Sequence, residues 1–157
     1  MLKRFLGILV VAFTVYACSS SEEEPSPSDS FDRGAMLTHL ADNIIIPAHQ
    51  DFMTKMAALK TAGEVFTTTP NQSHLEALRL SWFTAYKNWQ HIEMFNIGKA
   101  EELQYRFFMN VYPLTTSDVE SNIAEGNYNL ESANNHDAQG FPALDYLLHG
   151  LGNSDAE

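Results

Sequence analysis

Hydrophobic side chains recur three or four residues apart along most of the chain after residue 30, which is the spacing of one helical face. In residues 31–61 this face consists of Leu37, Ala41, Ile44, Ala48, Phe52, Met56 and Leu59. Pro47 falls inside the pattern and removes a hydrogen bond to the Asn43 carbonyl. The sequence therefore predicts a long first helix that is kinked or split near residue 47.

A second helix is predicted from about Ser73 to Phe95, because Ser73 and Glu76 have the spacing of a capping box. Gly98 then closes this section of the chain. The apolar stripe of the second helix consists of Leu75, Leu78, Trp82, Ala85, Trp89 and Ile92. Because both tryptophans repeat within this stripe, we interpret Trp82 and Trp89 as core residues rather than as a platform for a ligand.

Two shorter helical segments are predicted next. Residues 100–111 carry an apolar pattern that stops before Pro113, since a proline cannot continue a helix. Ser117 and Glu120 again have capping-box spacing, and the short helix that they begin should stop at Gly126.

Residues 127–139 are polar and rich in turn formers, so we expect a loop there. The last helix has Pro142 in its first turn, where the missing N–H has no partner to lose, and Gly150 at its end. No strand pattern and no internal repeat is visible in the sequence. The pattern as a whole predicts an all-α helical bundle.

The N-terminus has the features of a secretory signal. Lys3 and Arg4 precede an apolar run over residues 5–17, which is too short to span a membrane comfortably. The segment that ends at Cys18 fits a bacterial lipobox, in which the cysteine is lipidated. We expect residues 1–17 to be a lipoprotein signal peptide, and Cys18 to carry acyl chains such as palmitate that hold the protein on a membrane.

Residues 18–30 are serine, proline and acidic residues, which cannot bury enough apolar surface to fold. We expect a disordered tether there and a folded domain over residues 31–157. The three glutamates near the lipid are compatible with an ordinary linker or with an acidic export signal. The expected location is the outer membrane, on its periplasmic or its surface face.

The chain is acidic, with 9 Lys and Arg against 20 Asp and Glu and a formal net charge of −11. Loss of Lys3 and Arg4 with the signal would make the remaining chain more acidic still. Such a surface disfavours nucleic acid as a partner and favours cations or basic regions of other proteins.

The most informative motif lies at residues 140–148. Pro142 lies two residues after Gly140 and Asp145 three residues after Pro142, and an aromatic residue and two leucines follow Asp145. With the tryptophan helix, the apolar triplet before Pro47 and the Asn110–Pro113 segment, this stretch resembles the imelysin family, also called the M75 peptidase family. The family signature here is Gly-x-His-x-x-Glu, so Pro142 replaces the histidine and Asp145 the glutamate.

The resemblance implies a fold and a range of functions. Imelysin-like proteins resemble a pair of helical bundles, so this chain is expected to correspond to the first bundle, with a missing second half as one candidate partner. The family is associated with bacterial iron uptake and, in one early-described member, with peptide cleavage. Iron or another divalent metal is therefore the implied cofactor, held by the motif's histidine and glutamate.

Pro142 cannot ligate a metal, so the family pair is broken in this chain. Asp145 and His149 are four residues apart and share a helical face, so they could form a replacement carboxylate–imidazole pair. The alternative is that both are ordinary polar residues near a helix end. Glu93, one turn beyond Trp89, is a further candidate, and the alternative is a solvated glutamate.

Three functional hypotheses follow. The first is a lipid-anchored, non-catalytic accessory in iron uptake that binds a metal or an envelope protein. The second is a metallopeptidase. Such an enzyme would require a zinc site with about three protein ligands and a general base, and the sequence offers no such set. The third is an inactive split or truncated fragment. No catalytic residue is assigned, and we favour a protein that is not an enzyme.

Overall fold

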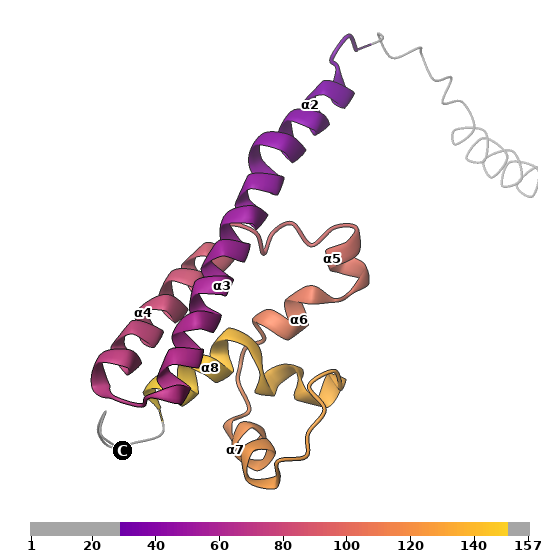
Figure 1. Cartoon of the computed structure of the whole chain (residues 1–157). Helices are drawn as coiled ribbons and strands as arrows, with labels where there is room; N and C mark the ends of the chain where they lie inside the picture. The colour runs from indigo at the N-terminus through magenta and orange to yellow at the C-terminus, as the bar shows by residue number, and fades with distance from the viewer. Residues whose placement is uncertain (1–28, 151–157) are drawn as a thin grey trace, which may run out of the picture. The chain divides into compact units, whose positions relative to one another are not determined.

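Helices alone make up the regular structure of residues 29–150, the part that the computed structural model describes (Figure 1). The prediction of an all-α fold is confirmed. The predicted signal peptide, the predicted lipidation site Cys18 and nearly all of the predicted tether lie outside the described residues. The chain divides into two compact units, Met1–Ala35 and Met36–Glu157, and the packing described below belongs to the second.

The first helical stretch consists of α2 (Arg33–Leu40), the π-helix η1 (Ala41–Ile45) and α3 (Ile46–Thr68). Pro47 lies in the first turn of α3, and Asn43, whose carbonyl it cannot bond, lies inside η1. The predicted interruption is therefore confirmed, and it takes the form of a wider π turn that accommodates the missing donor. The helix continues to Thr68, beyond the predicted end at residue 61.

The predicted apolar face of this stretch is buried only in its C-terminal part. Phe52 and Leu59 are buried, whereas Leu37 and Ile44 are 58% and 48% exposed. The helical face that the spacing predicts is therefore covered only in part among the described residues. The physical reason is that α4 covers α3, while periodicity marks a face without saying what lies against it.

The second helix, α4, spans Gln72–Trp89, and its N-cap is Asn71 rather than the predicted Ser73. The Asn71 side chain accepts a hydrogen bond from the His74 amide at 2.9 Å, which satisfies a free helix donor. The helix also ends six residues before the predicted Phe95. Ile92 remains buried although it follows the helix, because a turn bonds its amide to the Trp89 carbonyl at 3.0 Å.

The main core lies where α3, α4 and α8 (Gly140–His149) meet. α3 and α4 run antiparallel, as their short connection requires, and α8 packs against α4 (Figure 1). Each large apolar side chain buried there contributes about 1.5–3 kcal/mol. The buried members of this core are Phe52, Leu59, Leu78, Trp82, Ala85, Trp89, Ile92, Phe141 and Leu148.

The segment after Gly98 differs from the single helix predicted for residues 100–111. It forms two short helices, α5 (Lys99–Glu102) and α6 (Tyr105–Met109), because Gln104 adopts a left-handed conformation with φ 52°. An apolar pattern does not reveal such a backbone break in a residue other than glycine.

α7 spans Thr116–Glu125 and stops at Gly126 as predicted, where the glycine has φ 64°. Its N-cap is Thr115, so the predicted capping box at Ser117 is wrong. The predicted loop over 127–139 contains a 3₁₀ helix, η2 (Ala133–Ala138). A second, smaller core joins these elements to α8 through Val119, Ala138 and Ala143.

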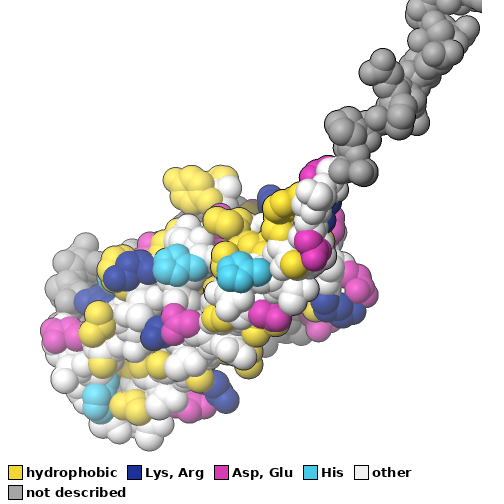
Figure 2. Space-filling model, turned by 90° about the horizontal axis from the view of Figure 1, so that it is seen from above, with side chains coloured by type: hydrophobic (Ala, Val, Ile, Leu, Met, Phe, Trp, Pro, Cys, Tyr) yellow, Lys and Arg dark blue, Asp and Glu magenta, His cyan; other side chains and the backbone are white. Residues whose placement is uncertain are grey.

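The face seen in Figure 2 carries acidic, basic and apolar side chains interspersed with one another. Its acidic residues therefore do not form one continuous patch on this side of the molecule. Among residues 29–150, no helix is both long and apolar enough to cross a bilayer.

Candidate functional site

Gly140 begins α8 in a conformation that only glycine adopts easily, with φ +76°. A Cβ at this position would lie 2.4 Å from the Met109 carbonyl oxygen and 2.8 Å from that of Phe108. The glycine therefore lets the start of α8 pack directly on the backbone of α6. This packing fixes the position of the residues that follow in the motif.

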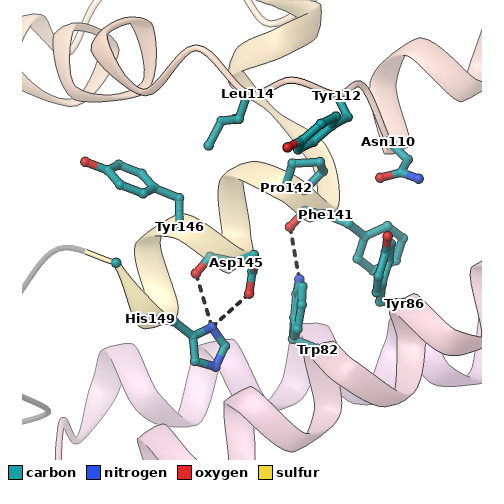
Figure 3. Close-up of a pocket in the computed structure, with 11 residues that line it drawn as sticks. Trp82, Tyr86, Asn110, Tyr112, Leu114, Phe141, Pro142, Asp145, Tyr146 and His149 are labelled. Carbon is teal, nitrogen blue, oxygen red and sulfur yellow. Dashed lines mark hydrogen bonds and ion pairs between the residues drawn. The ribbon is translucent and has the colours of Figure 1, made fainter.

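A cavity of about 510 Å³ opens beside α8 (Figure 3). Both altered motif positions, Pro142 and Asp145, line it, as expected for residues three apart on one helical face. We call this cavity the α8 pocket. Its other lining residues are Trp82, Tyr86, Asn110, Tyr112, Leu114, Phe141, Tyr146, His149 and Gly150.

Asp145 and His149 form a pair at one side of the α8 pocket. His149 Nδ1 lies 3.0 Å from Asp145 Oδ1 and 3.1 Å from the Asp145 carbonyl oxygen (Figure 3). The side chains are 54% and 41% exposed, so both are accessible to solvent and to a ligand. The imidazole ring also meets the Trp82 ring edge-on, with centroids 5.6 Å apart.

Aromatic rings form the wall of the pocket on the α4 side. Trp82 stacks on Tyr86 with centroids 5.5 Å apart and planes 14° from parallel. Tyr86 in turn contacts Phe141, with centroids 5.3 Å apart. Trp82 is therefore both a core residue and part of the pocket wall.

Two polar groups that line the pocket, one from α4 and one from α8, already have hydrogen-bond partners within the protein. Trp82 Nε1 donates to the Phe141 carbonyl oxygen at 3.1 Å. The Tyr146 hydroxyl donates to Glu120 on α7 and points away from Asp145 (Figure 3). This hydrogen bond to the Glu120 carboxylate raises the pKa of Tyr146 above its ordinary value of 10.0.

Glu93 does not line the α8 pocket. It lies at a neighbouring cavity of about 170 Å³, together with Trp89, Arg106 and Asn110. Asn110 lines both cavities, so they are adjacent. The structure thus brings Asp145 and His149 together and places Glu93 in a separate cavity.

The donors do not make up a complete metal site. No group of three or more His, Cys, Asp or Glu side chains is suitably clustered within residues 29–150. A resident zinc normally has three or four protein ligands. The two donors Asp145 and His149 therefore do not fit a resident catalytic metal.

Tyr86 and Tyr112 are pocket residues that sequence reasoning did not select. Tyr86 lies off the apolar stripe of α4, and Tyr112 is 88% exposed beside the cis Tyr112–Pro113 peptide. The one available signal was the Asn110–Pro113 segment, which contributed to the family resemblance. A segment that carries a family resemblance can also contribute to a binding site, and two residues of this segment, Asn110 and Tyr112, line the pocket.

Comparison with known proteins agrees with the motif. The imelysin (peptidase M75) family model matches residues 45–157. Iron-regulated protein A of Synechococcus elongatus is 23% identical over 107 residues, which cover 68% of this chain and 29% of that protein. The chain thus spans less than a third of the length of this curated relative. No solved structure matches this chain significantly. Since the family match runs from α3 to α8 and includes the whole α8 pocket, this chain belongs to the imelysin family.

Proposed function

We propose that this protein is a lipid-anchored, non-catalytic component of the cell envelope that assists iron uptake by binding a metal or a partner. Membership of the imelysin family supports this proposal, as does similarity to a protein whose name states that it is iron-regulated. The observation that carries it is the α8 pocket, because both altered motif positions line a cavity that is open to a ligand.

The chemistry of the pocket favours binding over hydrolysis. Hydrolytic zinc requires about three protein ligands, a water and a general base. Pro142 offers no donor, and Asp145 and His149 are bonded to each other. Iron therefore enters the proposal as cargo, which Asp145 and His149 could contact while its other ligands come from elsewhere.

The lipid anchor at Cys18 belongs to the same proposal. A basic start, an apolar run and a cysteine at the cleavage position support it. Anchoring would concentrate the domain at the membrane where iron is imported. We place it at the outer membrane, with the acidic residues 18–30 as the tether.

Calorimetric titration of the full chain with ferrous, ferric and zinc ions tests the binding role. We expect measurable iron binding that Asp145→Ala weakens at least tenfold. Asp42→Asn is the control, because it removes one exposed carboxylate from η1, outside the α8 pocket. Equal binding by wild type and Asp145→Ala would remove the pocket from the proposal.

Growth tests the physiological role independently. We expect a strain lacking the gene to grow poorly under iron limitation and to recover with wild type but less well with Cys18→Ser. Normal growth of the deletion strain without iron would contradict a role in uptake. Chelator-sensitive peptidase activity of the purified protein would favour the metallopeptidase hypothesis instead.

A further inference from the structure

The α8 pocket has the charge pattern of a site for a cation. Among the described residues that line it, Asp145 is the only carboxylate and none is a lysine or an arginine. An anionic ligand would therefore meet a repulsive carboxylate and no fixed positive charge.

Its walls have the character of an aromatic cation site. The negative faces of tryptophan and tyrosine rings attract ammonium and guanidinium groups within about 6 Å. Trp82, Tyr86 and Tyr112 line one pocket together with the carboxylate. Because Trp82 Nε1 already bonds the Phe141 carbonyl, the indole offers a ligand its ring rather than a hydrogen-bond donor.

His149 shows where a nitrogen-bearing group fits beside the carboxylate in this pocket. His149 Nδ1 lies 3.0 Å from Asp145 Oδ1, and its ring packs against the Trp82 ring in a T-shaped arrangement with centroids 5.6 Å apart. These are the two kinds of group that would hold an organic cation. His149 is exposed at the helix end, so a ligand can displace it without disturbing the core.

The size of the pocket separates an organic cation from a bare ion. A volume of about 510 Å³ falls within the range of about 300–1,000 Å³ for small-molecule sites. A bare metal ion would leave most of this space empty and would find only two side-chain donors of the usual kinds. An ammonium group with an apolar body would fill it and contact the rings.

We propose that the α8 pocket binds an organic cation, an ammonium or guanidinium group on an apolar body, between Asp145 and the rings of Trp82, Tyr86 and Tyr112. This inference does not depend on the role in iron uptake. The cation could belong to a free small molecule or to a basic side chain of a peptide. Both sources present the same chemistry to the pocket.

Binding of tetramethylammonium and n-butylammonium to the full chain, purified in a maltoside detergent, tests the proposal. The readouts are calorimetry and tryptophan fluorescence, since Trp82 lines the pocket. We expect saturable binding of both cations and at least tenfold weaker binding of 3,3-dimethylbutanol, a neutral analogue. Absence of cation binding, or equal binding of the neutral analogue, would overturn the proposal.

Variants locate the site. Asp145→Asn should weaken cation binding at least tenfold, and Tyr112→Leu severalfold, whereas the control Asp42→Asn should have no effect. His149→Gln should preserve or strengthen binding, because it removes a competing group from Asp145. If Asp145→Asn binds as wild type does, or if His149→Gln loses binding as fully as Asp145→Asn does, the assignment is wrong.

A capped Gly-Lys-Gly peptide distinguishes the two sources of the cation. Binding tighter than that of n-butylammonium would assign the pocket to a basic side chain of a protein. Weaker peptide binding with retained n-butylammonium binding would assign it to free organic cations. Failure of the iron titrations with retained cation binding would reject the iron role alone.

Discussion

The two sides of α8 differ in what the rest of the protein does with them. One side carries Phe141 and Leu148 into the main core, where both are almost fully buried, and Phe141 also contributes to the pocket wall. The other side carries Pro142, Asp145 and His149 to the wall of an open pocket. The same ten-residue helix is thus a packing element on one side and a ligand-facing surface on the other. The comparison teaches that the residues of α8 that hold the fold, such as Leu148, and those that can contact a ligand, such as Asp145, lie on different sides of one helix.

Phe141→Ala should have the largest effect on stability. The ring is 2% exposed and contacts the rings of Phe52, Tyr86 and Trp89. Its removal leaves a cavity, so we expect a loss of about 3–5 kcal/mol in the free energy of unfolding. Denaturant unfolding measures it, and Leu144→Ala, at a 38% exposed position of the same helix, is the control. Equal losses for both variants would contradict the two-sided view of α8.

Gly140→Ala should have the next largest effect. The left-handed backbone alone costs about 1–3 kcal/mol for a residue with a side chain. The new Cβ would also clash with the Met109 carbonyl oxygen, which cannot move as a side chain could. We expect a lower midpoint of thermal unfolding. Gly126→Ala is the control, since it has a positive φ but open space around its Cβ position. Equal destabilisation of the two variants would show that the α6 contact is unimportant.

Asp145→Asn should change stability by less than about 1 kcal/mol, because exposed ion pairs contribute little. Asp145 and His149 are both substantially exposed, and neither belongs to a core cluster. Chemical denaturation of wild type and variant measures the difference. A loss as large as that of Phe141→Ala would mean that the pocket side of α8 holds the fold as well.

The smallest expected effect is on the pH at which the Tyr146 hydroxyl ionises. Its pKa is raised by the hydrogen bond to Glu120, so the stabilisation is present below the ordinary pKa of 10.0 and is lost as pH rises through the higher folded value. A tyrosinate absorbance titration should lose one late-titrating component in Tyr146→Phe. Glu120→Gln should move that component toward 10.0. An unchanged titration in both variants would contradict the predicted bond.

The accuracy of the sequence predictions varied with the kind of signal. The stripe of α4 predicted its core, because Leu78, Trp82 and Trp89 repeat at helical spacing over about three turns. Pro47 and Gly126 predicted an interruption and a stop, because each restricts or permits particular backbone angles. The capping boxes at Ser73 and Ser117 were wrong, since an earlier residue provides the N-cap in each case. Capping motifs of this kind recur by chance in polar segments.

The candidate site was predicted only in part. The spacing of Asp145 and His149 predicted a shared face, and the two side chains are indeed 3.0 Å apart. Tyr86 could not be selected, because it lies off the apolar stripe of α4, and Tyr112 stood out only as part of the Asn110–Pro113 family segment. Glu93 stood near the tryptophan stripe in the sequence, yet it lies at the smaller cavity with Arg106.

The sequence by itself determined the helical class, the family and the loss of the motif histidine at Pro142. These properties depend on local spacing and residue identity, which one chain records directly. Only the tertiary structure decided that Pro142 and Asp145 face an aromatic pocket, and that Gly140 allows α8 to approach α6. A pocket requires residues far apart in the chain to meet. Their meeting follows from how the helices pack, and no local pattern encodes it.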